Sequence, residues 1–241
     1  MEYRFTSIML RKREVGETDR FYTFYTREAG KVTAIAKGVR KAEAKLASSL
    51  ETATLSEIMM VRTRGTGRIT GAVLEESYPS LHQSSVILRT LIRYLADVDK
   101  LVEPEEKDEP LFSLIKKYLE TAEAQSKSGI SESQFHLLSE AAYYQLFFHL
   151  GYRLELSLCA YSGEALVPGE RFFVSFEEGG IIKEKYAKEV RDRHPISEEA
   201  IKTLRLITRA RFDQVVKIVL GEKTLNELSR LRLVYEHWIR R

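Results

Sequence analysis

The chain has few of the residues that cross-link or bend a fold. Its 241 residues include one cysteine, one tryptophan and five prolines. A single cysteine excludes an internal disulfide framework and any all-cysteine zinc site within one chain. With 44% hydrophobic and 30% charged residues, the composition argues against disorder and allows one elongated fold or two small domains.

Long apolar runs and targeting patterns are also missing. No stretch has the length and apolar character of a membrane-spanning helix, and the start Met1-Glu2-Tyr3-Arg4 lacks a secretory pattern. We therefore expect a soluble cytoplasmic protein with no membrane contact.

Known catalytic motifs are absent. There is no Walker-type phosphate loop, GxSxG elbow or dinucleotide fingerprint, and the five histidines show no metal-binding spacing. Cys159 can act as a nucleophile only if the fold brings a histidine to it, and a buried bystander thiol is the favoured interpretation. We predict no catalytic residues and no enzymatic activity; an enzyme centred on Cys159 is the minor alternative.

The net charge of +3 is divided unevenly. Residues 1–77 carry 14 Lys and Arg against 10 Asp and Glu, residues 78–182 carry 9 against 16, and residues 183–241 carry 15 against 9. The net charges of +4, −7 and +6 indicate faces with different partners, although ordinary variation of surface charge explains them equally well.

Strand formers dominate the first 78 residues. Candidate strands, dense in β-branched and aromatic residues or alternating in polarity, cover residues 3–13, 20–26, 31–37, 53–62 and 68–78. Gly30 supplies a tight turn between the second and third, and a short helix is expected near Lys41–Leu50. Five strands in so short a segment predict a small barrel, of which the OB-fold is the commonest type.

Helical periodicity takes over after Pro79. Apolar spacing predicts helices over Leu81–Val102, Leu111–Ala122, Ser131–Gly151 and Thr224–Trp238, and Ser197 is a good N-cap for another. Leu158–Tyr186 breaks this period, with several glycines around a strand-like run at Arg171–Phe176. We predict an α+β fold: an OB-fold barrel over residues 1–79 and a helical domain over 80–241, with a small β insertion at about 157–190.

Cations gather where barrel loops are expected. Lys37-Gly38-Val39-Arg40-Lys41, followed by Lys45, occupies a strand-to-helix junction where backbone N–H groups can meet phosphate. Cationic loops on a small barrel are typical of proteins that bind single-stranded nucleic acid. The predicted DNA-binding residues are Arg27, Lys31, Lys37, Gly38, Arg40, Lys41, Lys45, Arg62, Arg64 and Arg68.

Four rings in the second strand add a candidate stacking surface. One set of Phe21, Tyr22, Phe24 and Tyr25 must face inward, and the other set can stack on bases. Filling of the barrel by all four rings is an equally good interpretation, and the sequence does not tell which rings face out.

Taken in order, four segments make the chain resemble the RecO family of bacterial DNA repair proteins. They are the turn Gly16-Glu17-Thr18-Asp19, the junction Lys37-Gly38-Val39-Arg40-Lys41, the helix end Phe147-Phe148-His149-Leu150-Gly151-Tyr152 with Cys159 shortly after it, and the pair Gly179-Gly180. The resemblance implies an OB domain, a helical domain and a zinc-finger-like insertion. Many members bind zinc there through two Cys-x-x-Cys pairs.

This chain departs from the zinc pattern. Cys159 stands at the first position, whereas Ser162, Lys183 and Tyr186 stand at the other three. Because one thiolate does not make a tetrahedral site, we predict no zinc and no other cofactor, with an insertion held by packing and β pairing.

The resemblance also implies the function and the partners. It predicts a recombination mediator that binds single- and double-stranded DNA, anneals complementary strands and, with RecR, helps load RecA onto DNA coated by single-strand-binding protein. It implies a cytoplasmic protein, associated with the nucleoid during repair. The acidic C-terminal tail of single-strand-binding protein is expected to bind the helical domain through Arg89, Arg93, Lys116 or Lys117. The alternative is a helical interaction scaffold whose barrel is purely structural.

Overall fold

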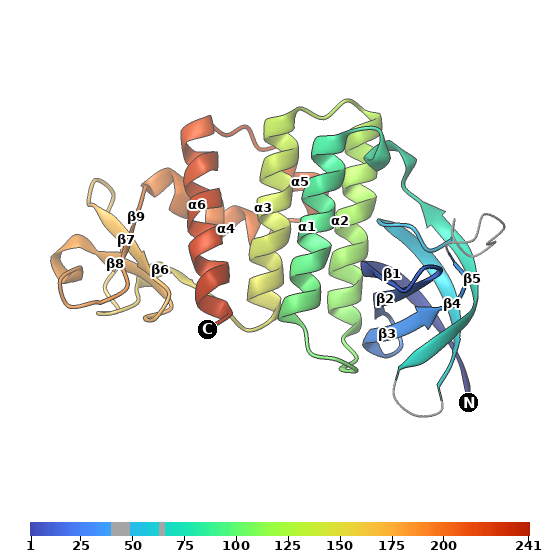
Figure 1. Ribbon diagram of the computed structural model, residues 1–241. Coiled ribbons are helices and arrows are strands. Elements are labelled where there is room, and N and C mark those ends of the chain that lie inside the picture. Colours follow the sequence, from blue (N-terminus) through green and yellow to red (C-terminus); the bar gives the residue numbers. More distant parts are fainter. Residues whose placement is uncertain (40–48, 63–65) are drawn as a thin grey trace. The chain divides into compact units, whose positions relative to one another are not determined.

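The structure is a computed structural model that describes residues 1–39, 49–62 and 66–241. The chain divides into two compact units, Met1–Gly129 and Ile130–Arg241. The first unit holds a closed barrel and two long helices, and the second holds a helix cluster and a four-stranded sheet (Figure 1).

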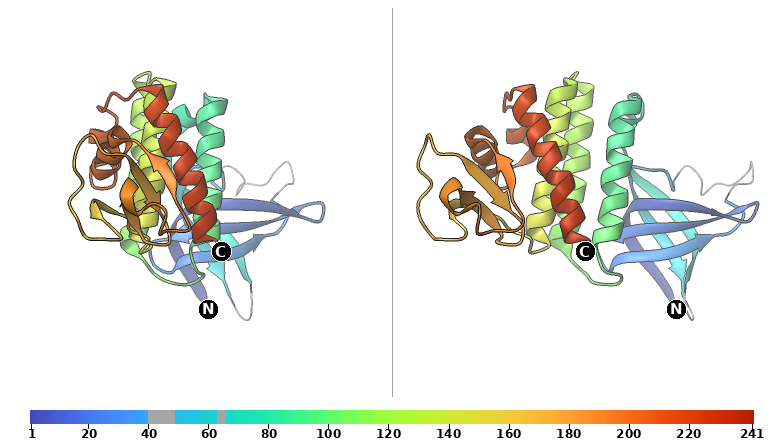
Figure 2. Two further views of the ribbon diagram at one scale, coloured as in Figure 1. Left: turned by 90° about the vertical axis from the view of Figure 1, so that its left-hand side faces the viewer. Right: turned by 60° about the vertical axis from the view of Figure 1, so that its left-hand side comes forward.

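Five strands form the barrel of the first unit in the order β1-β2-β3-β5-β4. Figure 2 shows the ribbon from two further sides. The strands are β1 (Glu2–Val15), β2 (Asp19–Thr26), β3 (Gly30–Ala36), β4 (Thr54–Val61) and β5 (Gly67–Ser77). Neighbouring strands are antiparallel, except that β3 and β5 run parallel where they close the barrel. The predicted OB-like barrel is therefore confirmed.

Alternate side chains of each strand fill the barrel, because successive residues of a strand point to opposite faces. Tyr22 and Phe24 of β2 point inward, and their rings stack with centroids 5.8 Å apart. The buried residues of this core are Phe5, Met9, Tyr22, Phe24, Val32, Ala34, Ala36, Val39, Leu50, Ile58, Met60 and Ile69.

Strand β1 contains one irregularity. Met9 pairs with Phe24 of β2, but Arg11 pairs with Thr23, so Leu10 is an extra residue in β1. A bulge of this kind bends the strand and increases its twist.

The β2–β3 hairpin lies against the connection between the two helices of the same unit. Gly30 has φ +65°, and a Cβ at this position would lie 1.9 Å from the carbonyl oxygen of Glu106. The Glu105 N–H donates to the Lys31 carbonyl oxygen over 2.9 Å. Only a glycine allows this close backbone approach.

Three helical segments follow the barrel: η1 (Pro79–His82), α1 (Ser85–Leu101) and α2 (Glu109–Lys127). Ser84 and Asp108 cap α1 and α2 with their side-chain oxygens. The buried Glu123 accepts hydrogen bonds from the N–H groups of Ser80 and Leu81, over 2.9 and 3.2 Å, and so ties η1 to α2.

The second unit begins with α3 (Glu132–His149), which opens with a capping box at Ser131 and Gln134. The unit also holds a sheet of the order β6-β8-β7-β9, three more α-helices and one short 3-10 helix. These elements are β6 (Glu155–Cys159), β7 (Phe172–Ser175), β8 (Gly180–Lys183), η2 (Glu184–Tyr186), β9 (His194–Ile196), α4 (Glu198–Ile207), α5 (Phe212–Val215) and α6 (Glu222–Ile239).

The expected long helices and all five barrel strands are present, with bounds that differ by a few residues. The sequence did not predict β8, which is buried along its whole length and shows no alternation, or β9, which contains Pro195. The helix expected near Lys41–Leu50 falls almost entirely outside the described residues. The domain boundary at residues 79 and 80 stays a prediction. No helix within the described ranges has the length and apolar character needed to cross a membrane.

Candidate nucleic-acid interface

The outer face of β1, β2 and β3 is the best candidate for a binding surface. Of the four rings in β2, Tyr22 and Phe24 fill the barrel. Tyr25 points outward but is fully buried, and its hydroxyl donates to the Asp108 carbonyl oxygen over 3.5 Å. Phe21 is half-buried and is therefore the ring of this group that solvent can reach.

One cross-strand row places Phe21 between two arginines. Arg13 of β1 pairs with Phe21, Phe21 pairs with Ile35 of β3, and Ile35 pairs with Arg68 of β5. Both arginines are exposed and the two apolar side chains between them are half-buried. Because paired residues share a face of the sheet, the four side chains form a continuous outer row. We call Arg13, Phe21, Ile35 and Arg68 the outer row.

A hollow of about 290 Å³ lies beside the Arg13 and Phe21 end of this row. Its lining joins two guanidinium groups, one ring and three hydroxyl groups, from Arg11, Arg13, Phe21, Thr23, Thr33 and Thr66. The Arg13 guanidinium lies over the Phe21 ring, 5.4 Å from its centroid. Arginines neutralise phosphate, hydroxyls donate to phosphate or sugar oxygens, and a half-exposed ring stacks on a base.

The first turn of the barrel is tied to the turn after β3. The Gly38 N–H donates to Asp19 Oδ1 over 2.8 Å, and Gly38 has φ +67°. Lys37, next to it, is exposed. Two of the segments noted in the sequence, Gly16–Asp19 and the start of the Lys37–Lys41 junction, thus meet at one end of the barrel.

Three of the predicted DNA-binding cations make contacts within the protein. Lys31 Nζ lies 2.6 Å from the Asp99 carbonyl oxygen, and its side chain is 14% exposed. The Arg27 guanidinium lies 5.1 Å from the Phe112 ring centroid. Arg62 pairs with Glu105. These three side chains contribute to the packing of α1, α2 and the loop between them on the barrel.

The other predicted site residues divide into two groups. Arg68 lies in the outer row, and Lys37 and Gly38 lie in the turn after β3. Arg40, Lys41, Lys45 and Arg64 fall outside the described residues. Sequence reasoning missed Arg11 and Arg13, although the triplet Arg11-Lys12-Arg13 within a predicted strand is a signal that could have found them.

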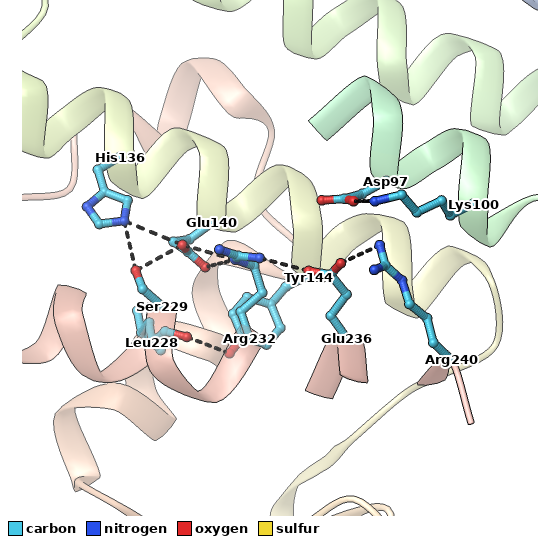
Figure 3. A network of polar contacts seen from close by, with 10 residues as sticks. All are labelled: Asp97, Lys100, His136, Glu140, Tyr144, Leu228, Ser229, Arg232, Glu236 and Arg240. Carbon is cyan, nitrogen blue, oxygen red and sulfur yellow. Dashed lines mark hydrogen bonds and ion pairs between the residues drawn. The ribbon is translucent and has the colours of Figure 1, made fainter. Parts of the chain in front are cut away.

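A serine, a histidine and a glutamate also meet in the second unit (Figure 3). Ser229 Oγ on α6 lies 2.8 Å from His136 Nε2 and 2.9 Å from Glu140 Oε1, both on α3, and 3.1 Å from the Leu225 carbonyl oxygen. In a nucleophilic triad the carboxylate binds the other ring nitrogen of the histidine. Here Glu140 lies on the Nε2 side, at 3.5 Å, so the contact links two helices and does not activate the serine.

Comparison with known proteins decides the family. The family model described as "Recombination protein O N terminal" matches residues 1–78, and "Recombination protein O C terminal" matches residues 92–238. The chain belongs to the RecO family. This membership confirms the resemblance that the four sequence segments indicated.

Curated relatives agree with the RecO assignment. A DNA repair protein RecO of Dehalococcoides mccartyi is 28% identical over 231 residues, which is 95% of this chain and 87% of the relative. A DNA repair protein RecO of Synechococcus sp. is 33% identical over 190 residues, covering 75% of this chain and 64% of the relative.

Three of the four positions at which zinc ligands were expected, Cys159, Ser162 and Lys183, meet in this RecO chain. Tyr186 is linked to them through Glu164, which binds both Tyr186 and Lys183. Cys159 is buried, and its thiol accepts hydrogen bonds from the Ser162 hydroxyl and from the N–H groups of Lys183, Ser162 and Tyr161. Burial acts to raise the pKa of the Cys159 thiol, but these hydrogen bonds outweigh it and the pKa is lowered.

The donor set at these positions does not suit zinc. It offers one thiol, one hydroxyl, one ammonium and one phenol, and a zinc ion takes thiolate, imidazole or carboxylate ligands. Across residues 1–39, 49–62 and 66–241, no three His, Cys, Asp or Glu side chains gather as a metal site would require. The prediction that this RecO protein binds no zinc stays a prediction, to be tested by metal analysis.

Proposed function

We propose that this RecO protein is a non-enzymatic recombination mediator that binds DNA on the outer face of its barrel. The outer row carries the proposal: two exposed arginines flank a half-exposed phenylalanine on four adjacent strands. The outer face of strands 2 and 3, with the neighbouring loops, is where OB-folds bind oligonucleotides. Thr66, beside the β4–β5 loop, completes the hollow on that face.

The proposed strand annealing and RecA loading follow from the family membership together with the outer face of the barrel. A strand held by its phosphates and stacked on Phe21 keeps its other bases available for pairing, as annealing requires. The proposed cellular role is annealing of complementary strands and, with RecR, loading of RecA onto DNA coated by single-strand-binding protein. The proposed location is the bacterial cytoplasm, at the nucleoid. Both single- and double-stranded DNA are proposed ligands.

The direct test is titration of a fluorescent single-stranded oligonucleotide at several salt concentrations. Phe21→Ala is expected to weaken binding about 5- to 150-fold, the range for loss of one stacked base, and to leave the salt slope unchanged. Arg13→Gln with Arg68→Gln is expected to lower the slope of log K against log salt by about 1.4, because two phosphate contacts are lost.

Arg4→Gln is the matched control. Arg4 is an arginine of the same strand, its side chain is 69% exposed, and it pairs loosely with Glu57 at 3.9 Å, away from the outer row. The Arg4→Gln variant should bind the oligonucleotide as the wild type does. If all variants bind the oligonucleotide with equal affinity and equal salt slopes, the proposed surface is wrong. A wild type that does not bind the oligonucleotide at moderate salt would favour the interaction scaffold instead.

We also propose that the tail of single-strand-binding protein docks on the exposed face of α1. Val86 and Ile92 are exposed apolar residues there, 43% and 42% accessible, and Arg89 and Arg93 are exposed at helical spacing beside them. Lys116 is a poorer candidate because it already pairs with Glu76 and Glu120, at 3.0 and 3.2 Å. An apolar strip flanked by cations suits an acidic peptide with an apolar C-terminus.

Titration of the tail peptide tests this second surface. Arg89→Gln with Arg93→Gln is expected to weaken binding on the order of tenfold, because the terminal carboxylate loses its partners. Lys116→Gln is the comparison variant and should bind as the wild type does. If Lys116→Gln loses affinity and the arginine variant keeps it, the site lies on α2.

A further inference from the structure

The side chain of Lys183 is buried within the insertion. It extends from the end of β8 and is only 8% exposed. Its ammonium group lies 3.2 Å from Glu164 Oε2, 3.2 Å from Glu170 Oε2 and 3.3 Å from the Ala165 carbonyl oxygen. An ammonium has three N–H donors, so these three oxygens satisfy it completely.

The three oxygen atoms come from the long loop between β6 and β7. Glu164 and Ala165 follow the turn after Cys159, and Glu170 lies two residues before the start of β7. Lys183 therefore fixes both halves of this loop to the central strand β8. Other contacts also hold this loop: the Cys159 N–H donates to the Glu164 carbonyl oxygen over 2.8 Å, and the Gly169 N–H donates to Glu198 Oε1 over 2.6 Å.

A second set of contacts surrounds the Lys183 ammonium group and its three oxygen partners. Glu164 also binds Lys185 Nζ at 2.7 Å and accepts a hydrogen bond from the Tyr186 hydroxyl at 2.7 Å. The Tyr186 ring in turn packs on the Tyr161 ring, with centroids 5.4 Å apart. Hydrogen bonds from Lys185, Tyr186 and Lys183 hold the pKa of Glu164 at about 2, so the carboxylate stays charged.

We propose that the buried ammonium of Lys183 takes the structural place of a metal ion in the insertion, which therefore folds without zinc. A metal would join the β6 turn to the end of β8 through four ligands. Here one fixed cation joins the end of β8 to the segment after that turn, through Glu164 and the Ala165 carbonyl oxygen, and to Glu170 near the start of β7. The positions that would hold metal carry instead the cation itself and the phenol that orients one of its carboxylates.

The wild-type chain gives the first test. Metal analysis should find no stoichiometric zinc, and the thermal unfolding curves in a chelator and in added zinc should superimpose. One zinc per chain, or a lower melting temperature in the chelator, would overturn the proposal.

Hydrogen exchange gives the second test, through Lys183→Met and its matched control Lys185→Met. Both variants lose a lysine that binds Glu164, but Lys185 is 54% exposed and Lys183 is buried. Lys183→Met should speed amide exchange in β7, β8 and the 160–171 loop on the order of tenfold or more, because two carboxylates lose their buried partner. Lys185→Met should change it far less, and equal effects of the two variants would refute the role of Lys183.

A gentler variant keeps the test decisive if Lys183→Met does not fold. Glu170→Gln keeps the shape of the side chain and removes one of the two charges that face the ammonium. It should speed exchange in the same peptides by several-fold, and exchange as in the wild type would overturn the proposal. DNA binding by the barrel is a separate readout that should not change in any of these variants.

Discussion

Replacing Arg232 with alanine is expected to destabilise the second unit by about 3–5 kcal/mol, as does breaking other buried ion pairs by removing one partner. Arg232 Nε lies 3.0 Å from Glu140 Oε2, and its Nη1 lies 3.1 Å from Glu236 Oε2. The guanidinium carbon also lies 4.2 Å from the Tyr143 ring centroid. Alanine would leave the buried Glu140 without its arginine, and Glu236 would keep only its ion pair with Arg240.

The design of this experiment follows from the same contacts. Arg232 joins α6 to α3, as Figure 3 shows, so amide exchange of these two helices is the appropriate measurement. A chain with two units need not unfold in one step, and a single melting temperature would mix their stabilities.

Arg230→Ala is the matched control for Arg232→Ala. Arg230 lies on the same helix, is exposed, and donates to the Pro195 carbonyl oxygen over 3.1 Å. Its loss should change stability by less than about 0.5 kcal/mol. Arg232→Met with Glu140→Gln should recover much of the loss, because uncharged groups of similar size leave less unpaired charge. Equal exchange in the Arg230 and Arg232 variants would contradict the assigned role.

Gly30→Ala is expected to be the most damaging single methyl addition among the described glycines of the barrel. At φ +65° a Cβ costs about 1–2 kcal/mol from backbone strain alone. The added Cβ would also lie 1.9 Å from the Glu106 carbonyl oxygen, a backbone atom that has to move. Overpacking of this kind adds about 1–3 kcal/mol.

Gly16→Ala is the control that separates the cost of backbone strain from the cost of the collision with Glu106. Gly16 has φ +60°, and a Cβ there would meet no atom within 4 Å. Both variants should therefore show the strain, and only Gly30→Ala should add the collision and loosen the helix connection from the hairpin. Amide exchange of β2 and β3, and of residues 103–108, measures the difference. If the two variants behave alike, Glu106 does not press on the hairpin as described.

Much of this architecture was predictable because it rests on local periodicity. The run Arg20–Thr26 is dense in strand formers and forms β2, and the apolar spacing of Ser131–Gly151 gives α3, capped at Ser131. The strands β8 and β9 were missed for a physical reason. A short strand that is buried throughout, and one that contains a proline, carry no alternation to detect.

The candidate site was harder to predict, because it depends on contacts between residues distant in sequence. Lys31 was a plausible phosphate ligand until α1 was seen to provide Asp99 as its partner. Phe21 and Tyr22 were equivalent in the sequence, and only the closure of the barrel places one ring outside and the other inside. Arg13 became relevant through its cross-strand neighbour, which no local pattern reveals.

The bulge at Leu10 determines which face of the barrel is positively charged. Phe5 and Met9, at odd positions, point into the barrel, and a regular strand would send Arg11 and Arg13 the same way. The extra residue reverses the alternation and turns both arginines outward. The charged face therefore depends on the bulge as well as on the residue types of β1. Deleting Leu10 should remove the bulge without turning the arginines, because Arg11 would still pair with Thr23 and Arg13 with Phe21.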